Sequence, residues 1–169
     1  EATGYGAVYF IQAMLIHANK EIRGMRAVIS GSGNVATHVA LKLLEDGAIP
    51  LTLSDREGYI HAHEGLSKEV ILLVQEIKER QGTLSSLTLP LGCTYHAGTP
   101  WSAVAADMYI PSATQNEIAL HDAEAIIAHG ATLVAEAANM PTTLEGVNAF
   151  QKAGVLFGPA KAVNAGGVA

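Results

Sequence analysis

The stretch 27–47, AVISGSGNVATHVALKLLEDG, constrains the fold more than any other part of the sequence. A short apolar run leads directly into a glycine-containing turn, and apolar residues then recur at helical spacing. Within the stretch, Gly31-x-Gly33-x-x-Ala36 is the dinucleotide-binding fingerprint in its alanine-ending form. It stands between a strand and a helix, as that motif requires. The stretch therefore predicts a strand–turn–helix unit that can hold a pyrophosphate.

Each small residue of the fingerprint has a physical role. Gly31 allows the tight turn, and Gly33 lets the backbone approach the pyrophosphate because it has no side chain. The N-terminus of the following helix stabilises the negative charge of the pyrophosphate. Ala36 lets that helix pack closely on the strand. Taken alone, the fingerprint leaves open a glycine-rich turn with a purely structural role.

The second strand, predicted over 49–55, ends in a carboxylate at the place where the fingerprint leads us to expect one. Asp55 can accept a hydrogen bond from a hydroxyl of the adenosine ribose. By itself Asp55 favours NAD, since a carboxylate repels the 2′-phosphate of NADP. Arg56, the next residue, can clamp that phosphate in a charge-assisted pair. We therefore expect NADP, with NAD possible; that Arg56 is only a solvated turn residue stays open.

Strand and helix patterns alternate along the rest of the chain. The predicted strands are 25–30, 49–55, 107–113, 132–137 and 155–159. The predicted helices are 7–18, 34–47, one capped by Ser67, 122–129, and one that starts in a capping box of Thr142 and Glu145. Apolar strands separated by helices imply a parallel sheet covered on both faces. The sequence thus predicts the α/β class, with a Rossmann-type doubly wound, mostly parallel sheet, helices on both faces, and a single dinucleotide-binding domain over 1–169.

Composition argues against several classes of function. The net charge is −6 and Lys and Arg do not cluster, which argues against nucleic-acid binding. No apolar run has membrane-spanning length, so no membrane partner is expected. Cys93 is the single cysteine and cannot form an internal disulfide, so we expect a reducing cytoplasm. His61 and His63 have no further ligand at suitable spacing, so no metal site is predicted and a solvated hairpin is favoured.

Several other segments are small and polar, and we expect them at strand ends, where open parallel sheets bind ligands. They are EATGYG (1–6), PSATQNE (111–117), AEAANMPTT (135–143) and GPAKAVNAGGVA (158–169). Together with SGSGNVA they closely resemble, in order and over the whole chain, the cofactor-binding domain of hexameric bacterial-type glutamate dehydrogenase. This sequence departs from the family pattern by small-for-small changes at Ser112, Ala137 and Ala160.

The resemblance implies cofactor contacts at individual positions. At the nicotinamide end, Thr3 is implied to hold the carboxamide, Asn139 to contact the ribose, and Asn164 to reach the nicotinamide and the substrate end. The other implied contacts lie at the diphosphate and along the cofactor, and they are Ser32, Asn34, Val35, Ala113, Thr114 and Gln115.

The resemblance also implies an activity, the reversible oxidative deamination of L-glutamate to 2-oxoglutarate and ammonia by hydride transfer to the cofactor. The substrate-binding lysines and the acid–base aspartate of the family belong to a preceding domain, and no motif here matches them. We therefore expect no catalytic residue in this chain. We expect it to be a fragment of a longer homohexameric enzyme, and we expect the isolated fragment to bind cofactor without turnover. Two alternatives stay open: the cofactor domain of a leucine, valine or phenylalanine dehydrogenase, and a non-catalytic dinucleotide-sensing module.

Overall fold

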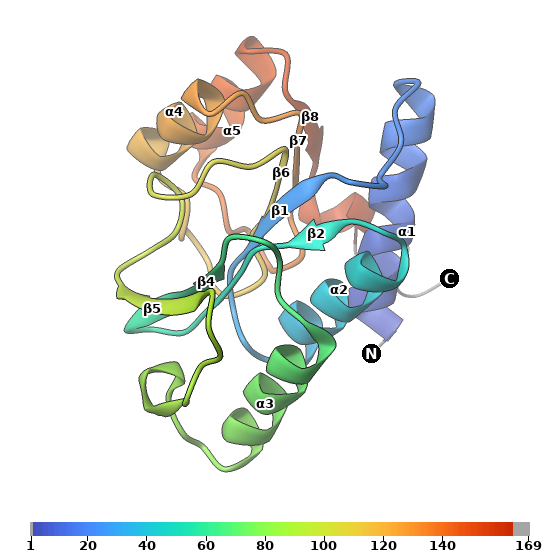
Figure 1. Cartoon of the computed structure of the whole chain (residues 1–169). Coiled ribbons are helices and arrows are strands. Elements are labelled where there is room, and N and C mark those ends of the chain that lie inside the picture. Colours follow the sequence, from blue (N-terminus) through green and yellow to red (C-terminus); the bar gives the residue numbers. More distant parts are fainter. Residues whose placement is uncertain (1, 164–169) are drawn as a thin grey trace.

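The computed structural model describes residues 2–163, in which a parallel sheet forms the centre of the molecule (Figure 1). Its strands are β1 (Arg26–Ile29), β2 (Ile49–Pro50), β6 (Met108–Ile110), β7 (Leu133–Ala135) and β8 (Leu156–Gly158). They lie in the order β2-β1-β6-β7-β8, and every neighbouring pair is parallel. The direction of strand progression reverses at β1, so the sheet is doubly wound, as predicted.

Helices cover both faces of this sheet. They are α1 (Ala2–His17), α2 (Asn34–Glu45), α3 (Lys68–Glu79), α4 (Leu120–Ala128) and α5 (Leu144–Lys152). Successive side chains of a strand point to opposite faces. Accordingly, Ala27 and Ile29 of β1 pack in one core with α1, α2 and α3, whereas Val28 packs in the other with α4 and α5. Both cores are built from fully buried apolar side chains, and the predicted two-faced architecture is confirmed.

The predicted strand 49–55 divides at Leu51 and enters two different sheets. The amide of Leu51 still donates to Ala27 O (2.8 Å). At the next residue, hydrogen bonds to β1 are made by the side chain instead of the backbone. The hydroxyl of Thr52 accepts from Ile29 N (3.0 Å) and donates to Ile29 O (2.8 Å). The backbone of β3 (Thr52–Ser54) is thereby free to pair with another partner.

That partner is an antiparallel sheet of β3, β4 (Gly58–Ala62) and β5 (Cys93–Ala97). A short 3₁₀ helix, η1 (Leu84–Ser86), precedes β5 and packs near β4. The segment 81–105 therefore contains η1, β5 and the loops that flank them. The small sheet lies beside the carboxyl end of β1 (Figure 1).

Residues 2–6 of EATGYG were wrongly expected at a strand end, because they form the first turns of α1. Gly4 leaves room for the packing of α1 on α2. A Cβ on Gly4 would lie 2.7 Å from the Cβ of His38 and 3.0 Å from Val35 O. Gly4 therefore lets α1 lie directly against the first turns of α2.

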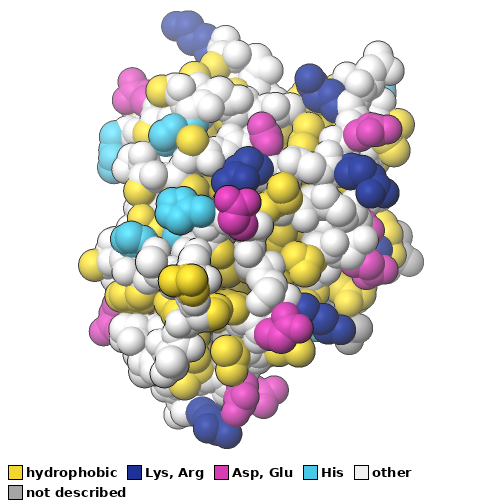
Figure 2. All heavy atoms as spheres, in the orientation of Figure 1, with side chains coloured by type: hydrophobic (Ala, Val, Ile, Leu, Met, Phe, Trp, Pro, Cys, Tyr) yellow, Lys and Arg dark blue, Asp and Glu magenta, His cyan; other side chains and the backbone are white. Residues whose placement is uncertain are grey.

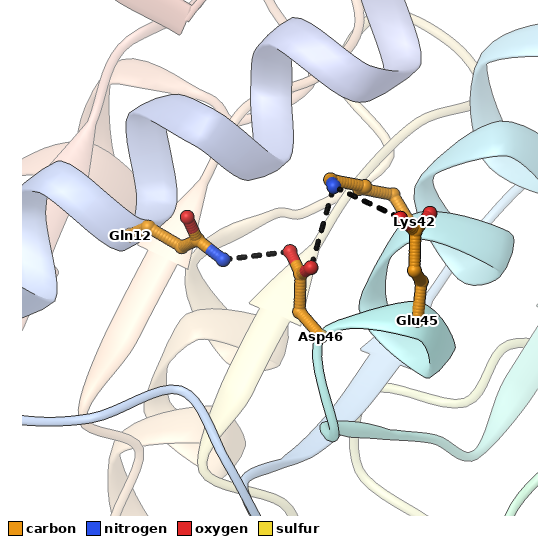
Figure 3. Close-up of polar contacts among 4 residues, drawn as sticks. All are labelled: Gln12, Lys42, Glu45 and Asp46. Atoms are coloured by element: carbon orange, nitrogen blue, oxygen red, sulfur yellow. Dashed lines mark hydrogen bonds and ion pairs between the residues drawn. The ribbon is translucent and has the colours of Figure 1, made fainter.

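A polar group at the end of α2 also fixes α1 (Figure 3). Asp46 accepts from the amide nitrogen of Gln12 (2.6 Å) and pairs with the ammonium group of Lys42 (3.3 Å), which is also 3.6 Å from Glu45. The same ammonium lies 5.0 Å from the ring centre of Tyr9. Burial disfavours the charged form of Lys42, but the hydrogen bond and charge of Asp46 outweigh it, so the pKa of Lys42 is raised.

The last helix begins one residue later than predicted. Thr143, rather than Thr142, caps α5 by accepting a hydrogen bond from Gly146 N (3.2 Å). Thr142 is buried, and its amide donates to the carboxylate of Glu136 (3.2 Å). Within residues 2–163, no helix combines the length and apolar character that crossing a membrane requires.

Candidate functional site

A cavity of about 680 Å³ lies at the carboxyl ends of β1, β3 and β6. Three segments contribute to its walls: 30–33 after β1, 54–57 at the end of β3 and just beyond it, and 112–114 after β6. β1 and β6 are neighbours at the point where the strand order reverses, which is where open parallel sheets bind ligands. The volume falls within the range of roughly 300–1,000 Å³ that is typical of small-molecule sites.

The cavity brings together predicted residues that are distant in sequence. From the glycine turn, the end of β3 and the loop after β6, these are Gly31, Ser32, Gly33, Asp55, Arg56, Ala113 and Thr114. Asn34 lines an adjoining cavity of about 450 Å³, which shares Ser32 and Gly33 with the first. The fold therefore gathers most of the positions proposed for the adenosine and diphosphate parts of a dinucleotide.

The remaining predicted residues lie elsewhere. Thr3 is exposed on α1, Val35 is half-buried in the first turn of α2, and Gln115 and Asn139 are exposed in their loops. None of these four lines either cavity. Asn164 lies outside the described residues. The nicotinamide contacts of Thr3, Asn139 and Asn164 accordingly stay predictions.

The two fingerprint glycines are required for different reasons. Gly31 has φ +90°, and a Cβ there would lie 2.7 Å from Ser112 O, so a side chain is excluded by conformation and by space. A Cβ on Gly33 would meet no atom within 4 Å. The space above Gly33 is therefore open toward the cavity, as a pyrophosphate against the backbone requires.

The N-terminus of α2 is electrostatically suited to an anion. Gly33 is its N-cap residue, and no side chain caps the helix. The first amides of a helix have no intrahelical acceptor, and the helix dipole places partial positive charge there. A phosphate at this position would accept hydrogen bonds from these amides, for which the chain itself supplies no side-chain acceptor.

Asp55 lines the cavity, but its carboxylate already has backbone donors. One oxygen accepts from Glu57 N (3.0 Å) and Gly58 N (3.1 Å), and the other accepts from Leu84 N (2.9 Å). A carboxylate has about four acceptor positions. Asp55 therefore retains capacity for a ribose hydroxyl while it holds the turn after β3 and joins it to η1.

Two cationic side chains line the cavity, Arg56 from the turn after β3 and Lys78 from the last turn of α3. Both are exposed, and neither forms an ion pair with another residue of the described part of the chain. The sequence analysis missed Lys78, because α3 comes close to the glycine turn only through its packing on α2. Helical spacing from the Ser67 cap predicts the helix but not the neighbour that Lys78 faces.

Glu117 is the second residue that the sequence analysis missed. It lines the cavity, and its carboxylate accepts from Ala113 N (3.0 Å), Thr114 N (3.1 Å) and the hydroxyl of Ser30. Burial raises the pKa of Glu117, and these hydrogen bonds offset the effect only in part. Its signal in the sequence is its position in ATQNE, four residues after Ala113.

The histidines of the small sheet lie apart from this cavity. The ring centres of His61 and His63 are 4.2 Å apart, and that of His96 is 6.4 Å from His61. Among residues 2–163, no group of three or more His, Cys, Asp or Glu side chains is arranged to hold a metal ion.

The face of the molecule drawn in Figure 2 shows no cluster of positive charge. Its Lys and Arg side chains lie apart from one another and are interspersed with Asp and Glu.

Comparison with known proteins connects this arrangement to one family. The family model for glutamate/leucine/phenylalanine/valine dehydrogenase matches residues 1–169. The chain is 47% identical over 171 residues to the NADP-specific glutamate dehydrogenase of Escherichia coli (strain K12), and the match covers 100% of this chain and 38% of that protein.

Solved structures agree with the sequence comparison. The glutamate dehydrogenase of Plasmodium falciparum superposes with a TM-score of 0.94 at 38% identity, over 99% of this chain and 36% of that one. A hetero-hexameric glutamate dehydrogenase from Thermus thermophilus gives a TM-score of 0.81 at 25% identity, over 99% and 37%. The chain thus spans little more than a third of the length of these relatives.

Proposed function

This chain belongs to the glutamate/leucine/phenylalanine/valine dehydrogenase family, and on that premise we propose that it is the NADP-binding part of a glutamate dehydrogenase. One observation carries the proposal: the cavity at the reversal point of the sheet joins the open side of Gly33 to two cations, Arg56 and Lys78. The uncapped start of α2 suits the pyrophosphate. The cations suit the additional phosphate that distinguishes NADP from NAD.

NADP is preferred over NAD for an electrostatic reason. Asp55 favours a ribose hydroxyl and disfavours a phosphate, but three backbone amides already share its charge. Arg56 and Lys78 line the same cavity, where an anion between them gains charge-assisted hydrogen bonds. The relative from Escherichia coli is described as NADP-specific, which supports the same choice.

The activity of the whole enzyme is part of the proposal. A bound nicotinamide would supply the hydride chemistry, in which a hydride leaves Cα of glutamate and the resulting imine is hydrolysed to 2-oxoglutarate and ammonia. This chain contributes cofactor binding, and we assign it no general acid or base. Glutamate is favoured over leucine, phenylalanine or valine because the relatives described above are glutamate dehydrogenases. A hexamer is proposed by analogy with the relative from Thermus thermophilus, and a cytoplasmic location from the single cysteine.

Binding of the two dinucleotides to this chain tests the proposal directly. We expect saturable binding of both NADPH and NADH, followed by fluorescence, with NADPH bound more tightly. A Gly33→Val variant should lose both, because a branched side chain would occupy the approach to the backbone. Glutamate added with NADP should give no turnover. Absence of saturable binding of either dinucleotide by the folded chain would refute the proposal, and turnover by this chain alone would refute the division of labour.

The two other candidates predict different results. A leucine, phenylalanine or valine dehydrogenase would show the same cofactor binding, so it is separated by assaying the full-length enzyme with each amino acid. A non-catalytic dinucleotide sensor would bind cofactor, but its full-length protein would oxidise none of these substrates.

A further inference from the structure

Glu117 occupies an unusual position for an acidic side chain. It lines a cavity that we propose to hold a polyanion, and it is half-buried there. All three of its hydrogen-bond donors are neutral: the amides of Ala113 and Thr114 and the hydroxyl of Ser30. A carboxylate without a structural role would destabilise the fold at this place, because burial without a neighbouring cation disfavours the ionised form. Its contacts therefore indicate what it does.

The contacts of Glu117 join two walls of the cavity. Ser30, which is 2% exposed, lies between the end of β1 and Gly31. Its hydroxyl accepts from Ser112 N (2.9 Å) and donates to Glu117. Ser112 in turn provides the carbonyl against which Gly31 lies. The chain of contacts thus runs from the fingerprint turn through Ser30 to the loop after β6.

The donor set favours an ionised carboxylate. Both backbone amides donate to the same oxygen, Oε2 of Glu117. A carboxylate keeps a second acceptor oxygen for the hydroxyl of Ser30, whereas the NH₂ group of glutamine accepts no hydrogen bond. The charge also strengthens each hydrogen bond that it receives. Replacement of Glu117 by glutamine therefore keeps the shape of the side chain but removes its charge and one of its two acceptor oxygens.

We propose that Glu117 is a positioning residue of the cofactor cleft: it holds the Ala113–Thr114 backbone against the end of β1 and so shapes the wall on which the dinucleotide lies. The inference rests on the proposed cofactor binding, but the hydrogen bonds exist in the chain without ligand. Glu117 touches no reacting atom in this role.

The role makes cofactor affinity sensitive to pH. The raised pKa of Glu117 means that its carboxyl takes up a proton at a higher pH than an exposed glutamate does. Protonation weakens the hydrogen bonds that it accepts, so affinity falls as the pH falls. The charged groups that share the cavity are Asp55, Arg56, Glu57 and Lys78. They are unchanged in Glu117→Gln, so the difference between this variant and the parent isolates Glu117.

The test is a titration with NADH between about pH 8 and pH 5. NADH is the probe because a phosphate monoester such as the 2′-phosphate of NADPH itself titrates near pH 6. We expect Glu117→Gln to bind NADH about tenfold more weakly at pH 8, as loss of one charged hydrogen bond predicts. We also expect its affinity to change less with pH than that of the parent chain. Glu124→Gln, the same change on the exposed face of α4, should match the parent at every pH.

A second measurement needs neither ligand nor variant. In the ligand-free parent chain, the amide proton shifts of Ala113 and Thr114 should titrate together with the Glu117 carboxyl. If the parent chain binds NADH and Glu117→Gln binds it equally well with the same pH profile, the inference is overturned and the proposed function stands. The inference is also overturned if the amide proton shifts of Ala113 and Thr114 do not change as the Glu117 carboxyl titrates. Parent chain that binds neither NADH nor NADPH overturns both.

Discussion

Gly31 and Ser54 are joined by two hydrogen bonds that run in opposite directions. The amide of Gly31 donates to the hydroxyl of Ser54 (2.8 Å), and the amide of Ser54 donates to Gly31 O (2.9 Å). Ser54 is the last residue of β3, so the fingerprint turn after β1 is anchored to the small antiparallel sheet. The position of the glycine turn is therefore set from outside the strand that leads into it.

Ser54→Ala tests this anchor. The variant leaves the buried amide of Gly31 without its acceptor, which should lower the free energy of unfolding by about 1–3 kcal/mol. NADPH affinity should fall as well, since the turn loses a restraint. Denaturant unfolding and a NADPH titration measure the two effects. The exposed Ser102→Ala variant is the control and should match the parent chain in both, and a Ser54→Ala variant that did the same would contradict the anchor.

The two glycines of the fingerprint should separate stability from binding. Gly31→Ala forces a Cβ into a left-handed backbone conformation and against Ser112 O, so it should cost roughly 1–3 kcal/mol of unfolding free energy. Gly33→Ala meets no atom, so its unfolding free energy should stay within about 0.5 kcal/mol of the parent. Gly33→Ala should nevertheless weaken NADPH binding. The reverse pattern would mean that the turn has another geometry.

Arg56 and Lys78 should discriminate between the two dinucleotides. Each change to alanine should weaken NADPH binding about tenfold, the effect of losing one charge-assisted contact, and change NADH binding much less. Lys68→Ala, at the exposed start of α3, supplies the control for lost positive charge. Equal losses for NADPH and NADH would show that neither cation interacts with the 2′-phosphate.

Gly4 should reverse the usual effect of alanine in a helix. Alanine is favoured over glycine in a helix interior by about 1 kcal/mol, yet a Cβ on Gly4 would meet His38 and Val35 O. Gly4→Ala should therefore lower the melting temperature. Ala13→Gly, at an exposed position of the same helix, should lower it also, for the ordinary reason of propensity. Stabilisation by Gly4→Ala would show that α1 can move away from α2.

His61 should make the chain less stable in mild acid. Burial lowers the pKa of His61, and the neighbouring His63, His96 and Arg26 lower it further. The folded state thus binds this proton less readily than the unfolded state. The penalty is absent well above the unfolded pKa of about 6.5, grows as the pH falls below that value, and levels off once the pH is below the folded pKa. Between about pH 7 and pH 5, the melting temperature of His61→Gln should therefore fall less than that of the parent chain. The same change at exposed His17 should not alter it.

Local patterns predicted most of the main sheet. The spacing of Gly31, Gly33 and Ala36 is a short-range signal for the turn and the start of α2, although the distant residues Ser54 and Ser112 hold the turn in place. Apolar runs such as 107–113 and 132–137 need only burial on both faces to become parallel strands. These elements were confirmed because no distant side chain changes their conformation.

The features that sequence could not predict depend on contacts between distant residues. The run 49–55 has one continuous strand pattern, and its division at Leu51 depends on Thr52 meeting Ile29. Small residues in EATGYG are compatible with a ligand loop or a close helix crossing, and only the position of His38 decides. Lys78 and Glu117 reach the cavity through packing and loop geometry that spacing does not encode.

The pair of hydrogen bonds between the Thr52 hydroxyl and the backbone of Ile29 in β1 has a consequence for the dynamics of the molecule. Segment 54–57 begins with the last residue of β3, and segment 98–101 follows β5. Both segments line the cavity, so the small sheet supplies walls to it. Beyond Leu51 this sheet is joined to β1 largely through side chains. Opening of the small sheet as a unit would then remove the ligand while the parallel sheet stays folded. Bound dinucleotide should accordingly slow hydrogen exchange along β4 and β5, in amides that the ligand never touches.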